Sequence, residues 1–300
     1  MEHILDWGVN IVLWLQQYSP LLDLPFIFLT LLGEQSFFVL LLPLLYWCAD
    51  RRLGIRFAVL FLLSAYFNGA AKAIAAQPRP FEYDPRVRSI FPAGGHGFPS
   101  GHAQNAVVVW GYLASSFRRP WLWAAAGLLI ALIPLSRIYL GVHFPTDILG
   151  GYLMGGALLL LYLRLEPAVE ARLRRSRLML QVLAGLCLPA LLILLIPAGD
   201  AYGIVVAASL MGLGAGSALE ARWVRFDTGG RLSTRALRFL VGMLFLLPLG
   251  WALETACSGQ GAQGFLQFLR YLALSLFAAV GMPWVFVRLG LAARLSAQNR

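Results

Sequence analysis

Charged side chains are scarce in this chain, and their scarcity argues against an ordinary soluble fold. Only 13% of the 300 residues are Asp, Glu, Lys or Arg, whereas 59% are hydrophobic. A single soluble core cannot bury so much apolar surface, so a lipid bilayer is the expected solvent. Lysine is rarest of all: Lys72 is the only one, and arginine supplies every other cationic side chain.

Cysteine is nearly as rare. Cys48, Cys187 and Cys257 fall at an inner helix end, in the middle of an apolar stretch and at an outer helix end, too far apart for a disulfide. No ligand spacing typical of a metal cluster is present, so neither a metal nor a cofactor is expected. The cysteines are expected to act as small apolar packing residues.

Long apolar stretches predict the fold class. A membrane-spanning helix needs about 20 mostly apolar residues. Nine stretches approach this length, at residues 24–48, 55–74, 103–117, 121–136, 148–163, 178–196, 202–219, 237–256 and 265–287. Gly33-Glu34-Gln35 interrupts the first, which indicates either a broken span or an interfacial helix before a span. The expected fold is all-α, a polytopic integral membrane helical bundle of about nine transmembrane helices.

The N-terminal residues do not have the pattern of a signal peptide. Asp6 stands where a basic region is required, and no small-residue cleavage pattern follows. Apolar positions 4, 5, 11, 12 and 15 share one helical face, and polar positions 6, 10 and 17 share another. This pattern predicts an N-terminal amphipathic helix on the membrane surface, with the first turn of an ordinary span as the alternative.

Basic residues alternate with the apolar stretches and predict the orientation. All but six of the 24 fall where the odd-numbered stretches end, whereas residues 197–200 and 258–261 contain none. The positive-inside rule therefore places the N-terminus outside and the C-terminus in the cytoplasm. The net charge of +10 is dispersed rather than gathered in one patch, so no nucleic-acid partner is expected. The six exceptions, all on the outer side, are Lys72, Arg79, Arg86, Arg88, Arg137 and Arg270.

Three blocks of the chain differ in character. Residues 1–164 contain every motif and are predicted to form the functional core. Residues 165–177 are predicted to form a basic cytoplasmic linker, and residues 178–300 a membrane extension of four helices. Glu254 and Arg270 lie near outer helix ends of this extension, where they are expected either to pair with each other or to contact substrate.

Three of the outer cations suit a phosphate group. Lys72 and Arg79 are seven residues apart, about two helical turns, and Pro78 and Pro80 are predicted to end the helix there. Arginine offers planar paired donors for phosphate oxygens, whereas lysine offers a compact charge. With Arg137 they are predicted to hold a phosphoryl group and to stabilise its charge in a transition state.

Two helix starts are predicted to face the same anion. Ser100 follows a proline and precedes an apolar stretch, which makes it a predicted N-cap. The main-chain amides at this helix start are expected to bind the anion, and Gly101 lets the backbone approach it closely. Pro145 is suited to the first position of the next helix, which places Asp147 in its first turn.

Two histidines complete the predicted site. His143 is the predicted nucleophile toward phosphorus, and Asp147 is expected to hold its other ring nitrogen. His102 is the predicted general acid, which later activates water. His96 sits in a glycine-rich turn and is interpreted as a loop residue rather than a catalyst. Outer-loop residues form a possible substrate-reading surface, with ordinary interfacial side chains as the alternative. They are Phe81, Tyr83, Arg86, Arg88, Phe91 and His96.

At Lys72-x6-Arg79-Pro80, Pro99-Ser100-Gly101-His102 and Ser136-Arg137-x5-His143-x3-Asp147 the chain resembles the type 2 phosphatidic acid phosphatase superfamily, the lipid phosphate phosphatases. The resemblance covers residues 55–164. It implies metal-independent hydrolysis of phosphomonoesters or diphosphates through a phosphohistidine, at a site open to the non-cytoplasmic side. It also implies a phosphate cradle of Lys72, Arg79, Ser100, Gly101 and Arg137. The nine-span layout is similar to the glucose-6-phosphatase and sphingosine-phosphate phosphatase branches.

The expected function is therefore that of a membrane phosphatase, in a bacterial inner membrane, acting on an amphiphile such as phosphatidate, a polyprenyl diphosphate, a sphingoid phosphate or lipid A. Lipid is favoured over sugar phosphate because a site at the membrane boundary admits a headgroup while the tail stays in hydrocarbon. Phosphotransfer between envelope molecules and sugar-phosphate hydrolysis are the enzymatic alternatives. A lipid or phosphate transporter and a membrane scaffold are the alternatives without catalysis. The sequence does not set the oligomeric state.

Overall fold

The computed structural model describes residues 2–195, 201–256 and 263–295, and these residues form helices without any β-strand. Within these described ranges, six helices are long and apolar enough to cross a membrane, or seven if the bent pair Asp23–Leu31 and Gln35–Ala49 is one span. The prediction of an all-α integral membrane protein is confirmed at this level, and the count of nine stays a prediction. Segments 197–200 and 258–261 and Cys257 lie outside the described residues.

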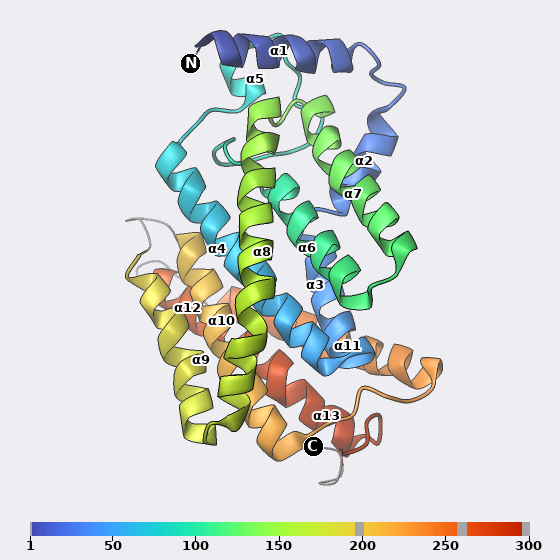
Figure 1. Cartoon of the computed structure of the whole chain (residues 1–300), viewed down its shortest axis with the longest axis vertical. Helices are drawn as coiled ribbons and strands as arrows, with labels where there is room; N and C mark the ends of the chain where they lie inside the picture. Colours follow the sequence, from blue (N-terminus) through green and yellow to red (C-terminus); the bar gives the residue numbers. More distant parts are fainter. Residues whose placement is uncertain (1, 196–200, 257–262, 296–300) are drawn as a thin grey trace. The chain divides into compact units, whose positions relative to one another are not determined.

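Figure 1 labels the helices in chain order. They are α1 (Glu2–Gln16), α2 (Asp23–Leu31), α3 (Gln35–Pro43), the π-helical η1 (Leu44–Ala49), α4 (Arg51–Ala75), α5 (Pro80–Tyr83), α6 (Gly101–Phe117), α7 (Pro120–Tyr139), α8 (Pro145–Arg175), α9 (Leu178–Ile193), α10 (Ala201–Leu219), the π-helical η2 (Glu220–Val224), α11 (Leu232–Ala256), α12 (Gln263–Leu276), the π-helical η3 (Phe277–Gly281) and α13 (Met282–Arg288).

The chain divides into two compact units. The first comprises Met1–Val39 and Leu63–Arg164, and the second comprises Leu40–Leu62 and Leu165–Arg300. Residues 165–175, assigned by sequence to a basic linker, are helical and continue α8. The predicted boundaries at residues 164 and 177 stay a prediction.

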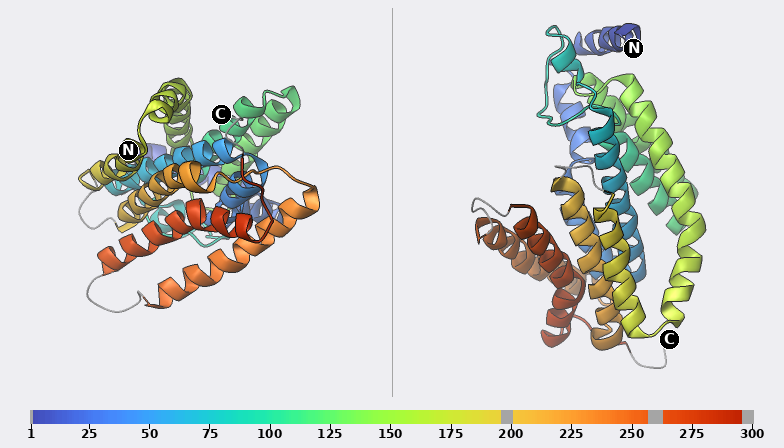
Figure 2. Two further views of the ribbon diagram at one scale, coloured as in Figure 1. Left: turned by 90° about the horizontal axis from the view of Figure 1, so that it is seen from below. Right: turned by 90° about the vertical axis from the view of Figure 1, so that its left-hand side faces the viewer.

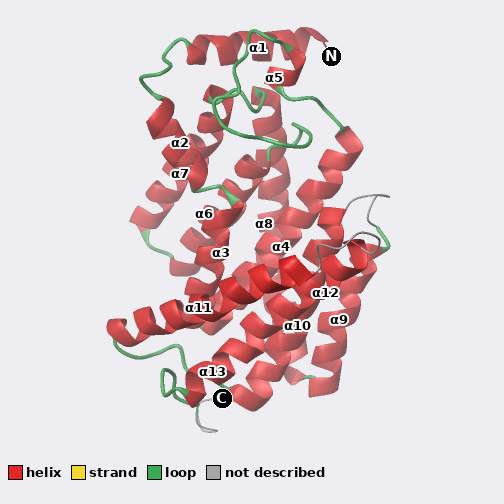
Figure 3. Ribbon diagram, turned by 180° about the vertical axis from the view of Figure 1, so that it is seen from behind, coloured by secondary structure: helices red, strands yellow, loops and turns green. Residues whose placement is uncertain are grey.

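In the first unit, α1 lies across the ends of α7 and α8 (Figure 1). Its Leu5, Val9 and Val12 are buried in an apolar cluster with Phe144 and Ile148 at the start of α8. The loop that joins α5 to α6 runs at the same end of this unit (Figure 3). The predicted position of α1 on a membrane surface stays a prediction.

Glycines allow α6 and α8 to approach closely. A Cβ atom on Gly151 would lie 2.5 Å from the carbonyl oxygen of Ser100, and one on Gly155 would lie 2.7 Å from that of Gln104. These distances are shorter than any ordinary contact, so only glycine permits this packing. The N-terminal ends of both helices consequently meet, and the Ser100 amide donates to the Asp147 carbonyl at 2.9 Å.

The second unit is organised around α10, which packs against α9 and α12 (Figure 2). Arg238 of α11 is buried and donates to main-chain carbonyls of four residues. They are Trp47, Thr228, Gly229 and Leu291. Cys48 is buried, as predicted for a packing residue. Cys187 is exposed, because α9 buries none of its side chains.

Candidate active site

His143 lies in the short turn between α7 and α8, with its ring buried. Its Nδ1 is 3.0 Å from Oδ2 of Asp147, a fully buried carboxylate in the first turn of α8. The same Oδ2 accepts the Phe144 amide at 3.0 Å, and Oδ1 accepts Gln77 Nε2 at 2.8 Å. An ionised carboxylate only accepts hydrogen bonds, so the proton of neutral His143 is on Nδ1 and the lone pair is on Nε2.

Cations lie around this lone pair. Arg79 Nη1 is 3.5 Å from His143 Nε2. Burial, and after it the nearby charges of Arg137 and Lys72, hold the pKa of His143 well below its ordinary value. The imidazole is therefore neutral near pH 7, which is the form able to act as a nucleophile.

Lys72 and Arg79 hold the glycine-rich loop. Lys72 is in the last turn of α4, and Arg79 follows in an extended conformation directly before α5. Between them they donate to four main-chain carbonyls at 2.5 to 3.0 Å. The acceptors are the carbonyls of Gly94, Gly95, His96 and Gly97. The His96 side chain is exposed, so His96 contacts Lys72 through its main-chain carbonyl and not through its ring. Arg79 Nη1 also donates to the Val142 carbonyl at 2.8 Å, next to His143.

Ser100 is the N-cap of α6, as predicted, and its Oγ accepts the Ala103 amide at 3.4 Å. One expectation needs correction. The Ser100 amide was expected to be available to an anion, but it donates to the Asp147 carbonyl. It therefore ties the start of α6 to the first turn of α8 instead of facing a ligand.

Arg137 and His102 present buried polar atoms that have no hydrogen-bond partner. Arg137 is 3% exposed, and its Nη1 donates to Thr30 Oγ1 at 2.6 Å while its Nε is unpartnered. His102 Nε2 lies 3.3 Å from Glu34 Oε1 without completing a hydrogen bond. Unsatisfied buried polar atoms are uncommon in proteins and are expected where a ligand binds. Both atoms suit contacts with phosphate oxygens.

The contacts of the first unit link seven of the eight residues that the sequence assigned to catalysis and phosphate binding. They are Lys72, Arg79, Ser100, His102, Arg137, His143 and Asp147. The eighth, Gly101, follows Ser100 at the start of α6. The links run through the glycine-rich loop, the α6–α8 contact and Glu34. Their roles stay predictions.

Sequence reasoning missed the amides that support the site. Asn68 Nδ2 donates to Gln104 Oε1 at 2.9 Å, and Gln104 Nε2 donates to the Ser64 carbonyl at 2.8 Å. A Cβ on Gly101 would lie 3.0 Å from Asn68 Oδ1, so this network stands directly behind the start of α6. A single Asn or Gln in an apolar stretch belongs to no recognisable motif, so the sequence alone does not predict that it supports the site. Glu34 did leave a signal, because it interrupts an apolar run.

The possible substrate-reading residues of the first unit have neighbours within that unit. The pairs are Tyr83 with Asp6, Arg86 with Asp84, Arg88 with Gln16 and Phe91 with Arg137. Phe81 packs beside two apolar clusters. In the second unit, Arg270 Nη2 is 3.1 Å from Glu254 Oε2, so these two residues pair with each other, which is one of the two arrangements predicted for them.

Two further observations bear on the chemistry. Among the residues that the structure describes, no group of three His, Cys, Asp or Glu side chains is arranged to hold a metal ion.

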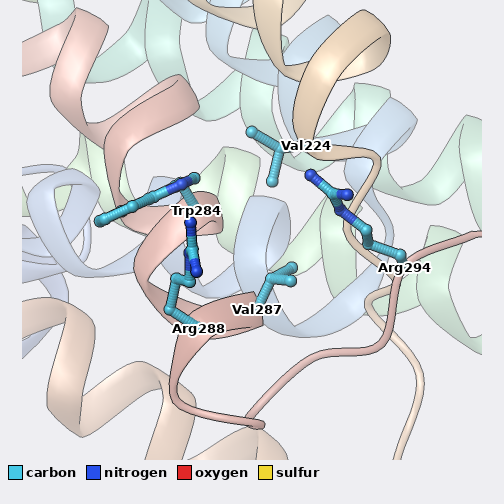
Figure 4. Close-up of a pocket in the computed structure, with 5 residues that line it drawn as sticks. All are labelled: Val224, Trp284, Val287, Arg288 and Arg294. Atoms are coloured by element: carbon cyan, nitrogen blue, oxygen red, sulfur yellow. The ribbon is translucent and has the colours of Figure 1, made fainter.

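A cavity of about 280 Å³ lies in the second unit, lined by Val224, Trp284, Val287, Arg288 and Arg294 (Figure 4). It has cations but no nucleophile, acid or base among its lining residues, so it is no candidate for catalysis.

The fold defines an all-α integral membrane protein, and comparison with known proteins gives its family. Residues 53–170 match the PAP2 superfamily, and residues 204–294 match the PAP2 superfamily phosphatase transmembrane extension. The two ranges do not overlap and together cover more than half of the chain. The chain belongs to the PAP2 superfamily, which confirms the resemblance found in the sequence.

Several relatives of the chain are named phosphatases. Lipid phosphate phosphatase delta of Arabidopsis thaliana is 32% identical over 54% of this chain and 43% of its own. Undecaprenyl-diphosphatase of Sulfolobus acidocaldarius is 30% identical over 41% of this chain and 60% of its own. Sphingosine-1-phosphate phosphatase 2 of Mus musculus is 35% identical over 45% and 40%. The matches thus span about half the length of these relatives.

Among solved structures, the crystal structure of a transmembrane PAP2-type phosphatidylglycerolphosphate phosphatase from Bacillus subtilis matches with a TM-score of 0.48. It is 24% identical and covers 59% of this chain and 90% of its own.

Proposed function

We propose that this protein is a membrane phosphatase that hydrolyses a terminal phosphate of a lipid phosphate or polyprenyl diphosphate. One observation carries the proposal: the buried His143–Asp147 pair, 3.0 Å apart, directs the unprotonated ring nitrogen of His143 toward the guanidinium of Arg79. Relatives named for lipid phosphates, sphingosine phosphate and undecaprenyl diphosphate support the substrate class.

The reaction has two steps. His143 Nε2 attacks phosphorus and forms an N–P bond as the P–O bond to the leaving group breaks, an ester bond in a lipid phosphate and an anhydride bond in a diphosphate, and the leaving oxygen takes a proton from His102. Water then attacks the phosphohistidine and gives its proton to His102, which releases phosphate and His143. Asp147 stabilises the imidazolium that forms at His143. Arg79 and Arg137 stabilise the developing charge on the phosphoryl oxygens.

The substrate enters from the outer side of a bacterial inner membrane in this proposal. The arrangement of basic residues puts the N-terminus and the active site outside and the C-terminus in the cytoplasm. Counting α6, α9 and the bent α2–α3 pair as spans gives nine transmembrane helices, with α1 on the membrane surface. A lipid reaches such a site laterally while its tail stays in hydrocarbon. No metal takes part, so activity persists in strong chelator.

A phosphate-release panel on the purified protein tests the function. It compares a lipid phosphate, a polyprenyl diphosphate and glucose 6-phosphate, the last because glucose-6-phosphatase 3 of Mus musculus is a 30% identical relative. We expect release from the amphiphiles and its loss, by more than a thousandfold, in His143→Ala. His3→Ala is the matched control, because His3 is exposed on α1. Activity that survives His143→Ala contradicts the mechanism and favours a transporter or scaffold.

Product analysis separates the remaining alternatives. Inorganic phosphate as the only phosphorylated product excludes a phosphotransferase, whereas phosphate on a second envelope molecule supports one. A sugar phosphate hydrolysed far better than any amphiphile overturns the lipid assignment.

A further inference from the structure

The break between α2 and α3 packs against the predicted general acid. The two helices are bent by 44° at this break, which lies outside the residues matched by either family model. A Cβ on Gly33 would be 2.4 Å from Cδ2 of His102, so the turn passes directly over the imidazole. Glu34 follows at once and brings a carboxylate into an otherwise apolar stretch.

Glu34 faces two site residues with one oxygen. Its Oε1 is 3.3 Å from His102 Nε2 and 3.5 Å from Arg137 Nη1. The Glu34 side chain is 31% exposed, while those of His102 and Arg137 are 12% and 4% exposed. A carboxylate in such a place is stable when cations accompany it. Arg137 is one such cation, and His102 becomes the second whenever its imidazole is protonated.

The hydrogen bonds of His102 identify the nitrogen that carries the mobile proton. The ring hydrogen-bonds the main chain of Thr30. Its Nε2 is the nitrogen that lies 3.3 Å from Glu34 Oε1, so the bond to Thr30 comes from Nδ1. A proton that is gained or lost by His102 is therefore on Nε2, the atom that faces Glu34.

We propose that Glu34 is a positioning residue that holds the exchangeable proton on His102 Nε2. The inference rests on the proposed phosphatase function. When the ester P–O bond breaks, the proton moves from Nε2 to the leaving oxygen. When water attacks the phosphohistidine, its proton returns to Nε2 and again faces the Glu34 carboxylate. The site thus has two carboxylate–histidine pairs, one for the nucleophile and one for the acid.

The charges around His102 make this carboxylate necessary. The groups that face it are Glu34 from the α2–α3 break, Arg137 from α7 and His143 from the turn before α8. Arg137 opposes a positive imidazolium, and His143 has no negative charge to offset it. Glu34 is the anion of this set, and an opposite charge at this distance favours the charged form of its partner.

The Glu34→Gln variant tests the role through leaving-group and pH dependence. It removes the charge and keeps the shape, so we expect the basic limb of the kcat profile to move to lower pH by about one unit or more. At pH 8 hydrolysis of an alkyl lipid phosphate should slow about tenfold or more. Hydrolysis of p-nitrophenyl phosphate should change little, because its leaving group needs no proton. Glu34→Asp keeps the charge, so the basic limb of its kcat profile should stay at the wild-type pH. Glu2→Gln, on the exposed start of α1, is the matched control.

Coupling to His102 completes the test. In a His102→Gln background, Glu34→Gln should cause no further loss, because both changes remove the same proton. Equal losses on both substrates with an unmoved pH limb indicate a structural role and overturn the inference. Residual phosphate release by His143→Ala refutes the phosphatase mechanism itself. Inactive His143→Ala with a wild-type-like Glu34→Gln refutes only the role of Glu34.

Discussion

Two of the four histidines of the chain stand beside carboxylates, and the two pairs differ in how firmly the carboxylate is held. Asp147 is fully buried and accepts hydrogen bonds from Gln77, Phe144 and His143. Such a carboxylate keeps one tautomer and one ring orientation, as a nucleophile requires. The Glu34 side chain is 31% exposed and stands off at 3.3 Å from its histidine. A looser pair suits a proton that has to leave and return.

The pH dependence of His143 is a prediction at the scale of one residue. An ordinary imidazole loses its neutral form below a pKa of about 6.5. Burial, and then the charge of Arg137, hold the pKa of His143 well below that value, so the protonation that blocks attack comes at lower pH. We expect kcat/KM, corrected for ionisation of the substrate, to show no loss of activity at the ordinary histidine pKa of about 6.5 as the pH falls.

The control removes the charge of Arg137, which is one cause of the lowered pKa of His143. Arg137→Gln should lower activity and also move the acid limb of kcat/KM upward, toward the ordinary histidine range. An acid limb near pH 6.5 in the unchanged protein, with no movement in Arg137→Gln, contradicts the assignment of His143 as the neutral nucleophile.

At the scale of elements, the contact between α6 and α8 decides whether the two halves of the site meet. Gly151→Ala adds a Cβ that would lie 2.5 Å from the Ser100 carbonyl, so the helices have to separate. We expect a destabilisation of about 1–3 kcal/mol. Phosphate release should fall by about a hundredfold, because catalysis is sensitive to displacements of about 1 Å.

Gly156→Ala is the matched control on the same helix, because a Cβ there meets nothing within 4 Å. Alanine is the better helix former by about 1 kcal/mol, so this variant should be neutral or slightly stabilised. Unfolding temperatures in detergent and phosphate release measure both variants. If Gly151→Ala and Gly156→Ala have equal unfolding temperatures and equal phosphate release, the close approach of α6 and α8 does not matter for the site.

The elements also explain what sequence can and cannot predict. Apolar length and prolines predicted most helices and the starts of α6 and α8, because these are local properties of the chain. The eight assigned site residues fall at ends of such stretches, so the sequence could group them. The bond of the Ser100 amide to Asp147, and the support from Asn68 and Gln77, depend on which helices touch. No local pattern encodes such contacts.

At the scale of the molecule, the basic residues form two groups. The proposed orientation places the cations of the candidate site on one side of the membrane and those of most connecting segments on the other. In the proposed orientation, the arginines that follow the odd-numbered stretches lie at cytoplasmic ends, whereas Lys72, Arg79 and Arg137 lie on the other side against the positive-inside rule. The first unit offers these three cations contacts with carbonyls, a hydroxyl and carboxylates. Charge kept against the orientation rule is therefore what we expect of a site that binds an anionic substrate.

Accessibility to a membrane-impermeant maleimide tests this orientation. Single cysteines are introduced as Ser89→Cys, in the exposed loop between α5 and α6, or as Ala171→Cys, on the exposed face of α8, after Cys48, Cys187 and Cys257 are changed to alanine. We expect Ser89→Cys to react in intact bacterial cells and Ala171→Cys to react only after permeabilisation, because Arg172, Arg174 and Arg175 follow Ala171. Phosphate release by the background protein confirms its folding. The reverse labelling pattern refutes the outward-facing site and requires a cytoplasmic substrate.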